Sequence, residues 1–102
     1  IRTHPAVGAK ILAPFGEVAA FVRHHHERPD GHGYPDGLSG DSIPLGAGIL
    51  GVAEAFDAMT SSRPYRRSRS RQQALTEIEA LRGEQFVPAA VDALIEVSAA
   101  GV

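Results

Sequence analysis

The chain has 102 residues, of which 43% are apolar and 22% charged, and its formal net charge is −2. This length and composition indicate one soluble domain, and no apolar run is long enough to span a membrane. The absence of cysteine excludes disulfides and thiol nucleophiles, and it favours a reducing, cytoplasmic location. Any metal site must therefore use histidine and carboxylate ligands. The chain starts at Ile1 without a leader peptide, so we expect it to be part of a longer protein.

Two short helices are predicted in the first third of the chain. The first lies near residues 4–12, and the sequence APFG breaks it before a second helix near 17–27. His25 and His26 continue the apolar series of the second helix, so their side chains should point toward the interior. His24 falls off this stripe, and we interpret it as an ordinary packed or surface residue.

A long loop and a strongly apolar helix follow. Residues 28–46 are rich in glycine and proline, which excludes a regular element, and ordered loops of this length are usually functional. The helix predicted over 47–60 is apolar almost all round, with Glu54 and Asp57 as its only charges. It should therefore be the central and most buried helix, with two buried acids.

The last part of the chain predicts two more helices after an arginine-rich turn. Ser70 and Gln73 form a capping-box signature for a helix over 71–81, and Pro88 begins a helix that continues toward Ser98. No stretch shows the alternation typical of strands, so the fold should be all-α. The arginines near this turn indicate either an anion-binding site or a solvated surface turn; they are Arg63, Arg66, Arg67, Arg69 and Arg71. For Arg67, Arg69 and Arg71 we favour the solvated turn.

The histidine pair and the acidic helix together predict a metal site. Histidine and carboxylate are the ligands of iron, manganese and similar ions. Adjacent residues of a helix diverge by about 100°. His25 and His26 should therefore serve different ions of a bimetallic centre, in which two ions activate a water against a phosphodiester.

Residues 25–35 read HHERPDGHGYP, and they resemble the HHExxDGxGYP signature of the HD-GYP family, a branch of the HD superfamily of metal-dependent phosphohydrolases. The likeness extends to both sides of this motif. His4 begins a segment similar to the family's HxxxGxxIL helix, and residues 53–65 (AEAFDAMTSSRPY) are similar to its ADxFDALTSxRPY segment. We interpret residues 1–102 as a partial HD-GYP domain with an HD-like helical bundle that is incomplete at its N-terminus.

The resemblance implies a bacterial signalling phosphodiesterase that hydrolyses cyclic di-GMP to pGpG or GMP with two or three iron or manganese ions. The implied ligands are His4, His25, His26 and Glu54, and the implied nucleophile is a metal-bound hydroxide, so no side chain is assigned as the catalytic group. GGDEF-type signalling proteins are further partners that we expect, whereas DNA is not one.

Residues beyond the ligands also receive roles from this resemblance. Arg63 and Arg66 match positions that contact nucleotide phosphates, and an arginine fork suits that task. Tyr34 has two interpretations, stacking on a guanine or packing under the loop. Support of the loop or of the ligand histidines is the role expected of three acids; they are Glu27, Asp30 and Asp57.

Departures from the family pattern leave other functions open. The family's HD pair should precede His4, and Glu54 stands where the family has aspartate. The alternatives are a catalytically degenerate module that senses the nucleotide or binds a protein, and an HD hydrolase for another nucleotide. An incomplete bundle also leaves apolar faces uncovered, so we expect self-association.

Overall fold

The structure is a computed structural model, and it describes residues 16–62, 64 and 67–99. His4, Arg63, Arg66 and the helix predicted near 4–12 lie outside the described residues. The described chain contains no strand, only two isolated bridges, so the all-α prediction is confirmed. Its elements are α2 (Glu17–His24), the 3₁₀ turn η2 (Gly40–Ser42), α3 (Leu45–Thr60), α4 (Arg71–Ala80) and α5 (Pro88–Ala99).

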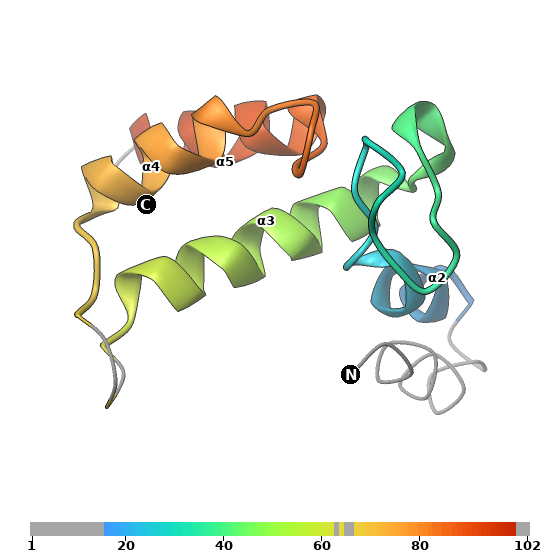
Figure 1. The fold of residues 1–102 in the computed structure, drawn as a ribbon, viewed down its shortest axis with the longest axis horizontal. Coiled ribbons are helices and arrows are strands. Elements are labelled where there is room, and N and C mark those ends of the chain that lie inside the picture. The colour runs from blue at the N-terminus through green and yellow to red at the C-terminus, as the bar shows by residue number, and fades with distance from the viewer. Residues whose placement is uncertain (1–15, 63, 65–66, 100–102) are drawn as a thin grey trace.

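Helix α3 is the central element of the described fold. It packs against α2, α4 and α5, and α4 also packs against α5. Figure 1 shows α4 and α5 along one side of α3, and α2 at the start of α3 away from them. The loop that follows α2 runs beside the start of α3 and reaches the α4–α5 turn (Figure 1), where the Asp30 amide donates to the Glu84 carbonyl. None of the described helices is long and apolar enough to cross a membrane.

The apolar core lies where α3, α4 and α5 meet. Ile78 and Val91 are fully buried side chains, and Val52 of α3 and Phe86 of the α4–α5 turn join them. The predicted capping box at the start of α4 is confirmed, because Ser70 Oγ accepts from the Gln73 amide while the Gln73 side chain accepts from the Ser70 amide. The capping box stabilises the start of α4, the helix that carries Ile78 of this core.

The central position predicted for α3 is confirmed, but the prediction that its acids are buried is wrong. The Glu54 side chain is 55% exposed, and Asp57 is exposed too. The reason is that α2, α4 and α5 cover only part of the surface of α3, so apolar side chains at its start are left uncovered as well. Among these are Leu45, Ile49 and Leu50. Exposed apolar side chains of this kind are typical of surfaces that bind another protein chain. Self-association itself stays a prediction.

Helix α2 ends earlier than its apolar series predicts. Its last residue is His24, and His25 forms the C-cap. The downstream Pro29 restricts Arg28 to extended backbone, which disfavours continuation of a helix. His26 and Glu27 therefore lie in the turn after the helix, and this placement decides the geometry of the site.

Candidate metal centre

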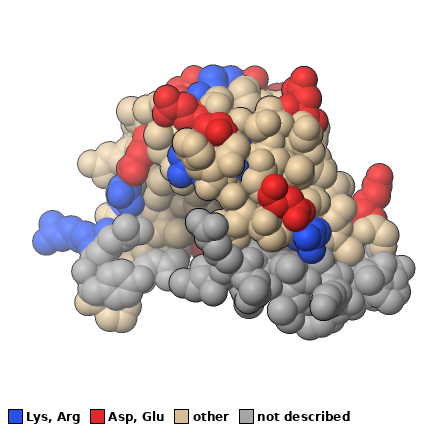
Figure 2. Space-filling model, turned by 45° about the vertical axis from the view of Figure 1, so that its right-hand side comes forward, with Lys and Arg blue, Asp and Glu red and all other residues tan. Residues whose placement is uncertain are grey.

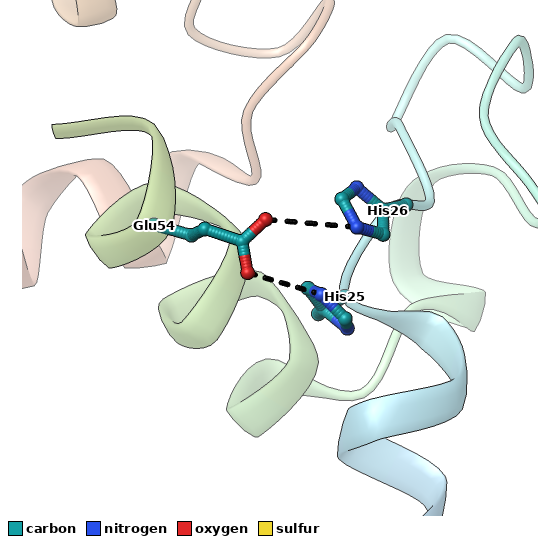
Figure 3. A group of neighbouring side chains, drawn as sticks. All are labelled: His25, His26 and Glu54. Carbon is teal, nitrogen blue, oxygen red and sulfur yellow. Dashed lines mark ion pairs between the residues drawn. The ribbon is translucent and has the colours of Figure 1, made fainter. Parts of the chain in front are cut away.

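Three side chains that the sequence marked as metal ligands lie together in the structure. His25 and His26 come from the end of α2, and Glu54 reaches them from the middle of α3 (Figure 3). The distance from His25 Nε2 to Glu54 Oε2 is 3.2 Å, and that from His26 Nε2 to Glu54 Oε1 is 3.6 Å. One ligand atom from each of the three residues lies within 4.8 Å of the others.

The separation between His25 and Glu54 suits a metal ion, and that between His26 and Glu54 is slightly longer than an ion between the two donors would give. Two donors that each lie about 2.1 Å from one ion, at tetrahedral or octahedral angles, are separated by roughly 3.0–3.4 Å. The orientation of His25 agrees, because its Nδ1 lies 2.6 Å from the carbonyl oxygen of Val22. A carbonyl can only accept, so Nδ1 carries the proton and Nε2 keeps its lone pair for a metal, the arrangement that ligand histidines usually show.

The expectation that His25 and His26 diverge rests on a helix that does not extend so far. Since His26 lies past the end of α2, the two rings do not follow helical spacing, and their centroids are 4.1 Å apart. Both rings therefore face the same carboxylate. Their side chains are 11% and 30% exposed, so the pair lies at the wall of the site and remains open to a ligand.

A glycine allows α3 to approach the histidines. A Cβ atom at Gly51 would lie 2.6 Å from the carbonyl oxygen of His25, closer than packed atoms permit. Gly51 precedes Glu54 by one turn, so this contact brings the carboxylate within reach of His25. Beside the three ligand candidates lies a cavity of about 350 Å³, which Arg28, Tyr34, Gln85 and Val87 also line.

Glu27 is the buried acid of the described structure. Its two carboxylate oxygens accept from the backbone amides of Leu38 and Asp36, at 2.9 and 3.0 Å. His24 Nδ1 lies 3.2 Å from the same carboxylate, and Arg23 pairs with Asp36 at 2.9 Å. These contacts hold the loop against the end of α2. Metal-compatible spacing is also found among His24, Glu27 and Asp36. However, the carboxylates of Glu27 and Asp36 already accept hydrogen bonds from loop amides and from Arg23.

Asp30 and Tyr34 shape the loop in front of the cavity. Asp30 accepts from the His32 amide at 3.0 Å and from Arg28 Nη2 at 2.7 Å. The His32 hydrogen bond, followed by the one from Arg28, lowers the pKa of Asp30. The Tyr34 ring stacks on His26 with a centroid distance of 5.0 Å. One face of Tyr34 thus supports a ligand candidate, which neither interpretation from the sequence included.

The remaining expected residues are divided between the site and its surroundings. Asp57 contacts Ser61 at the end of α3 and does not line the cavity. His24 is packed rather than free, in keeping with its ordinary interpretation. Sequence reasoning missed Arg28 and Gln85, which line the cavity. Arg28 occupies a variable position of the signature and Gln85 precedes a core phenylalanine, so only the charge of Arg28 offered a signal.

Comparisons with known proteins agree with this geometry. A family model described as "HD domain" matches residues 1–89. The chain is 45% identical to a cyclic di-GMP phosphodiesterase response regulator of Xanthomonas campestris over 93% of its length, and 38% identical to a cyclic di-GMP phosphodiesterase of Thermotoga maritima over 95%. It covers 26% and 28% of these two proteins, so it spans about a quarter of each.

A solved structure also shares the fold. The crystal structure of a cyclic GMP-AMP-specific phosphodiesterase of Vibrio cholerae superposes with a TM-score of 0.80 at 27% identity, over 95% of this chain and 23% of that one. The family match covers residues 1–89 of the chain. The relatives are named as cyclic dinucleotide phosphodiesterases, which is the kind of enzyme that the HHExxDGxGYP signature implies. The chain therefore belongs to the metal-dependent HD-domain family, in its HD-GYP branch.

Proposed function

We propose that residues 1–102 are part of a phosphodiesterase domain that hydrolyses cyclic di-GMP to pGpG or GMP. The observation that carries this proposal is the convergence of the His25 and His26 Nε2 atoms on the Glu54 carboxylate, beside a cavity. The names of the relatives point to cyclic dinucleotides as the substrate class.

The proposed metal is iron or manganese, with two or three ions in the complete domain. His25, His26 and Glu54 would hold it, together with His4, which lies outside the described residues. When bound, such ions polarise a phosphoryl oxygen and activate a water. Other described residues contribute by fixing the positions of the ligand candidates. Val22 fixes the His25 tautomer, Tyr34 supports the His26 ring, and Glu27 holds the loop that presents Tyr34.

Glu54 decides between hydrolysis and mere binding in this proposal. It is one methylene longer than the aspartate of the family pattern, yet its two oxygens reach both histidines in the described structure. This contact supports a working site rather than a degenerate one. Hydrolysis with Glu54 present is therefore expected, and Glu54→Asp should retain metal and activity, whereas Glu54→Gln should lose both.

The test uses the longer protein that contains this chain, loaded with manganese or iron and assayed for cyclic di-GMP breakdown by chromatography. His25→Ala should lower turnover by roughly 100-fold or more and reduce the metal content, because a ligand is removed. The matched control is His32→Ala, since the His32 side chain is 80% exposed and lies outside the cavity lining. Wild-type protein that binds metal and nucleotide without turnover would support the sensor alternative instead.

A further inference from the structure

Arg28 places a cation in the cavity of the candidate metal centre. It is the only lysine or arginine among the described residues that line this cavity, which it shares with His25, His26 and Glu54. Within the HHExxDGxGYP signature it fills one of the variable positions, so the family pattern assigns it no task. The set of metal-ligand candidates therefore does not explain why a cation lies in this cavity.

The guanidinium of Arg28 is held in place at one edge. Its Nη2 donates to Asp30 Oδ2 at 2.7 Å, and Asp30 is itself fixed by the amide of His32. The side chain as a whole is 38% exposed, yet its Nε is buried and has no hydrogen-bond partner in the described structure. Buried donors without a partner are rare in proteins, and a functional role is one of the explanations for them.

The charges of the cavity indicate what this cation would bind. The lining carries two carboxylates, Glu27 and Glu54, and one guanidinium, so with neutral histidines its formal charge is −1. Figure 2 shows acidic and basic side chains interspersed on the visible described surface, without a broad basic patch on that face. A phosphate in the cavity thus depends on local cations. Arginine suits this task because its planar fork can donate two parallel hydrogen bonds to one phosphate.

We propose that Arg28 is a substrate-binding residue whose guanidinium contacts a phosphate of the cyclic dinucleotide. The proposal rests on the proposed function, and it adds a described residue to Arg63 and Arg66, for which the family resemblance implies phosphate contacts. Asp30 keeps the fork oriented, and the metal ions supply the remaining positive charge. A contact to a base edge would be chemically possible for arginine too, but it would not answer the net negative charge of the lining.

The test compares Arg28→Gln and Arg28→Lys with wild type in the longer, manganese-loaded protein. Arg28→Gln should raise the KM for cyclic di-GMP by about 10- to 100-fold, as expected for a lost charge-assisted hydrogen bond, while kcat changes little. Arg28→Lys, which keeps the charge but loses the fork, should fall between. The matched control is Arg82→Gln, since Arg82 also pairs with carboxylates, those of Glu79 and Asp92, but lies outside the cavity lining.

Other readouts separate the possible causes. In the Arg28→Gln variant, the inhibition constant of cyclic di-AMP should rise by the same factor as the KM for cyclic di-GMP, because both dinucleotides carry the same phosphates. A loss restricted to cyclic di-GMP would reveal a base contact and overturn the proposal, as would an unchanged KM. A variant with altered metal content would show that Arg28 acts on the metal centre instead, which also contradicts the proposal.

Failure of the proposed function would be recognised separately. If wild type does not hydrolyse cyclic di-GMP, binding of inorganic phosphate and of GMP to wild type and Arg28→Gln would be compared by calorimetry. Weaker binding of both ligands by the variant would keep Arg28 as a phosphate ligand of another reaction. Equal binding by the two proteins would reject it.

Discussion

Two regions of the described fold are stabilised by different kinds of interaction. The side of α3 that faces α4 and α5 is closed by apolar burial, with Ile78 and Val91 fully excluded from solvent. The region around α2 and its loop relies less on such burial, because α2 contains no buried residue, although Ile43 of the loop is buried. Instead, the buried carboxylate of Glu27 binds two backbone amides of the loop.

This difference explains where a reactive site can be built. Apolar packing is non-directional, so it stabilises a fold without fixing any one polar atom. Hydrogen bonds to a buried carboxylate are directional, and they fix the loop that presents Tyr34 to His26. Stability and site geometry should therefore respond to different substitutions in this chain.

The largest effect on stability is expected from Ile78→Ala. Removal of a fully buried isoleucine side chain should lower the free energy of unfolding by about 2–5 kcal/mol, through lost burial and the cavity left behind. Urea denaturation measures this change. Ile95→Ala is the matched control, since Ile95 is 38% exposed, and it should cost under about 1 kcal/mol. Equal losses for the two variants would contradict the assignment of the core.

Glu27→Gln should produce a smaller loss of stability but a larger loss of metal binding than Ile78→Ala. Glutamine can accept from one of the loop amides, but its own NH₂ would face the other, so one buried donor loses its partner at about 1–3 kcal/mol. The loosened loop should weaken manganese binding by roughly 10- to 100-fold, the usual range for residues that support ligands.

Titration of the metal in the two variants separates the two regions. The exposed Glu96 provides the control for the loss of one negative charge, and Glu96→Gln should leave manganese affinity unchanged. If Ile78→Ala weakened manganese binding as much as Glu27→Gln, the two regions would not be separate in the way proposed.

The core side could be predicted from the sequence more fully than the site. The pair Ser70 and Gln73 located α4, and Pro88 located α5, because these signals are local. The true end of α2 could not be found in this way, since the apolar series continues through His25 while the chain turns. The exposure of Glu54 depends on which helices cover α3, a tertiary property that no single helix pattern contains.

The juxtaposition of three ligand candidates could be predicted from the sequence, but the contacts around them could not. The signature pointed to His25 and His26, the similar segment over residues 53–65 pointed to Glu54, and the structure brings these three together. The stacking of Tyr34 on His26 and the presence of Arg28 in the cavity arise from the path of the loop. That path depends on long-range hydrogen bonds such as those of Glu27, which spacing along the sequence does not reveal.

A smaller effect is expected at the start of α4, on the core side. Ser70→Ala removes the acceptor for the Gln73 amide, which lies 3.1 Å from Ser70 Oγ, and should cost about 1 kcal/mol in urea denaturation. Ser70→Gly should cost only a few tenths of a kcal/mol relative to serine, because glycine is tolerated at this position. The reverse order would show that the capping box does not stabilise the helix in solution.

The smallest effect concerns acid, and it should be confined to the loop side. The hydrogen bonds from the His32 amide and from Arg28 lower the pKa of Asp30 in the folded protein. A carboxyl with a lowered folded pKa contributes stability above its unfolded pKa of about 4, and this contribution is lost as the pH falls through the folded value. Asp30→Asn should therefore be less stable than wild type at pH 7, and the difference between the two should shrink below pH 4. Urea denaturation from pH 2 to pH 7 checks this, and a difference that stays constant over that range would mean that the charge of Asp30 does not hold the loop.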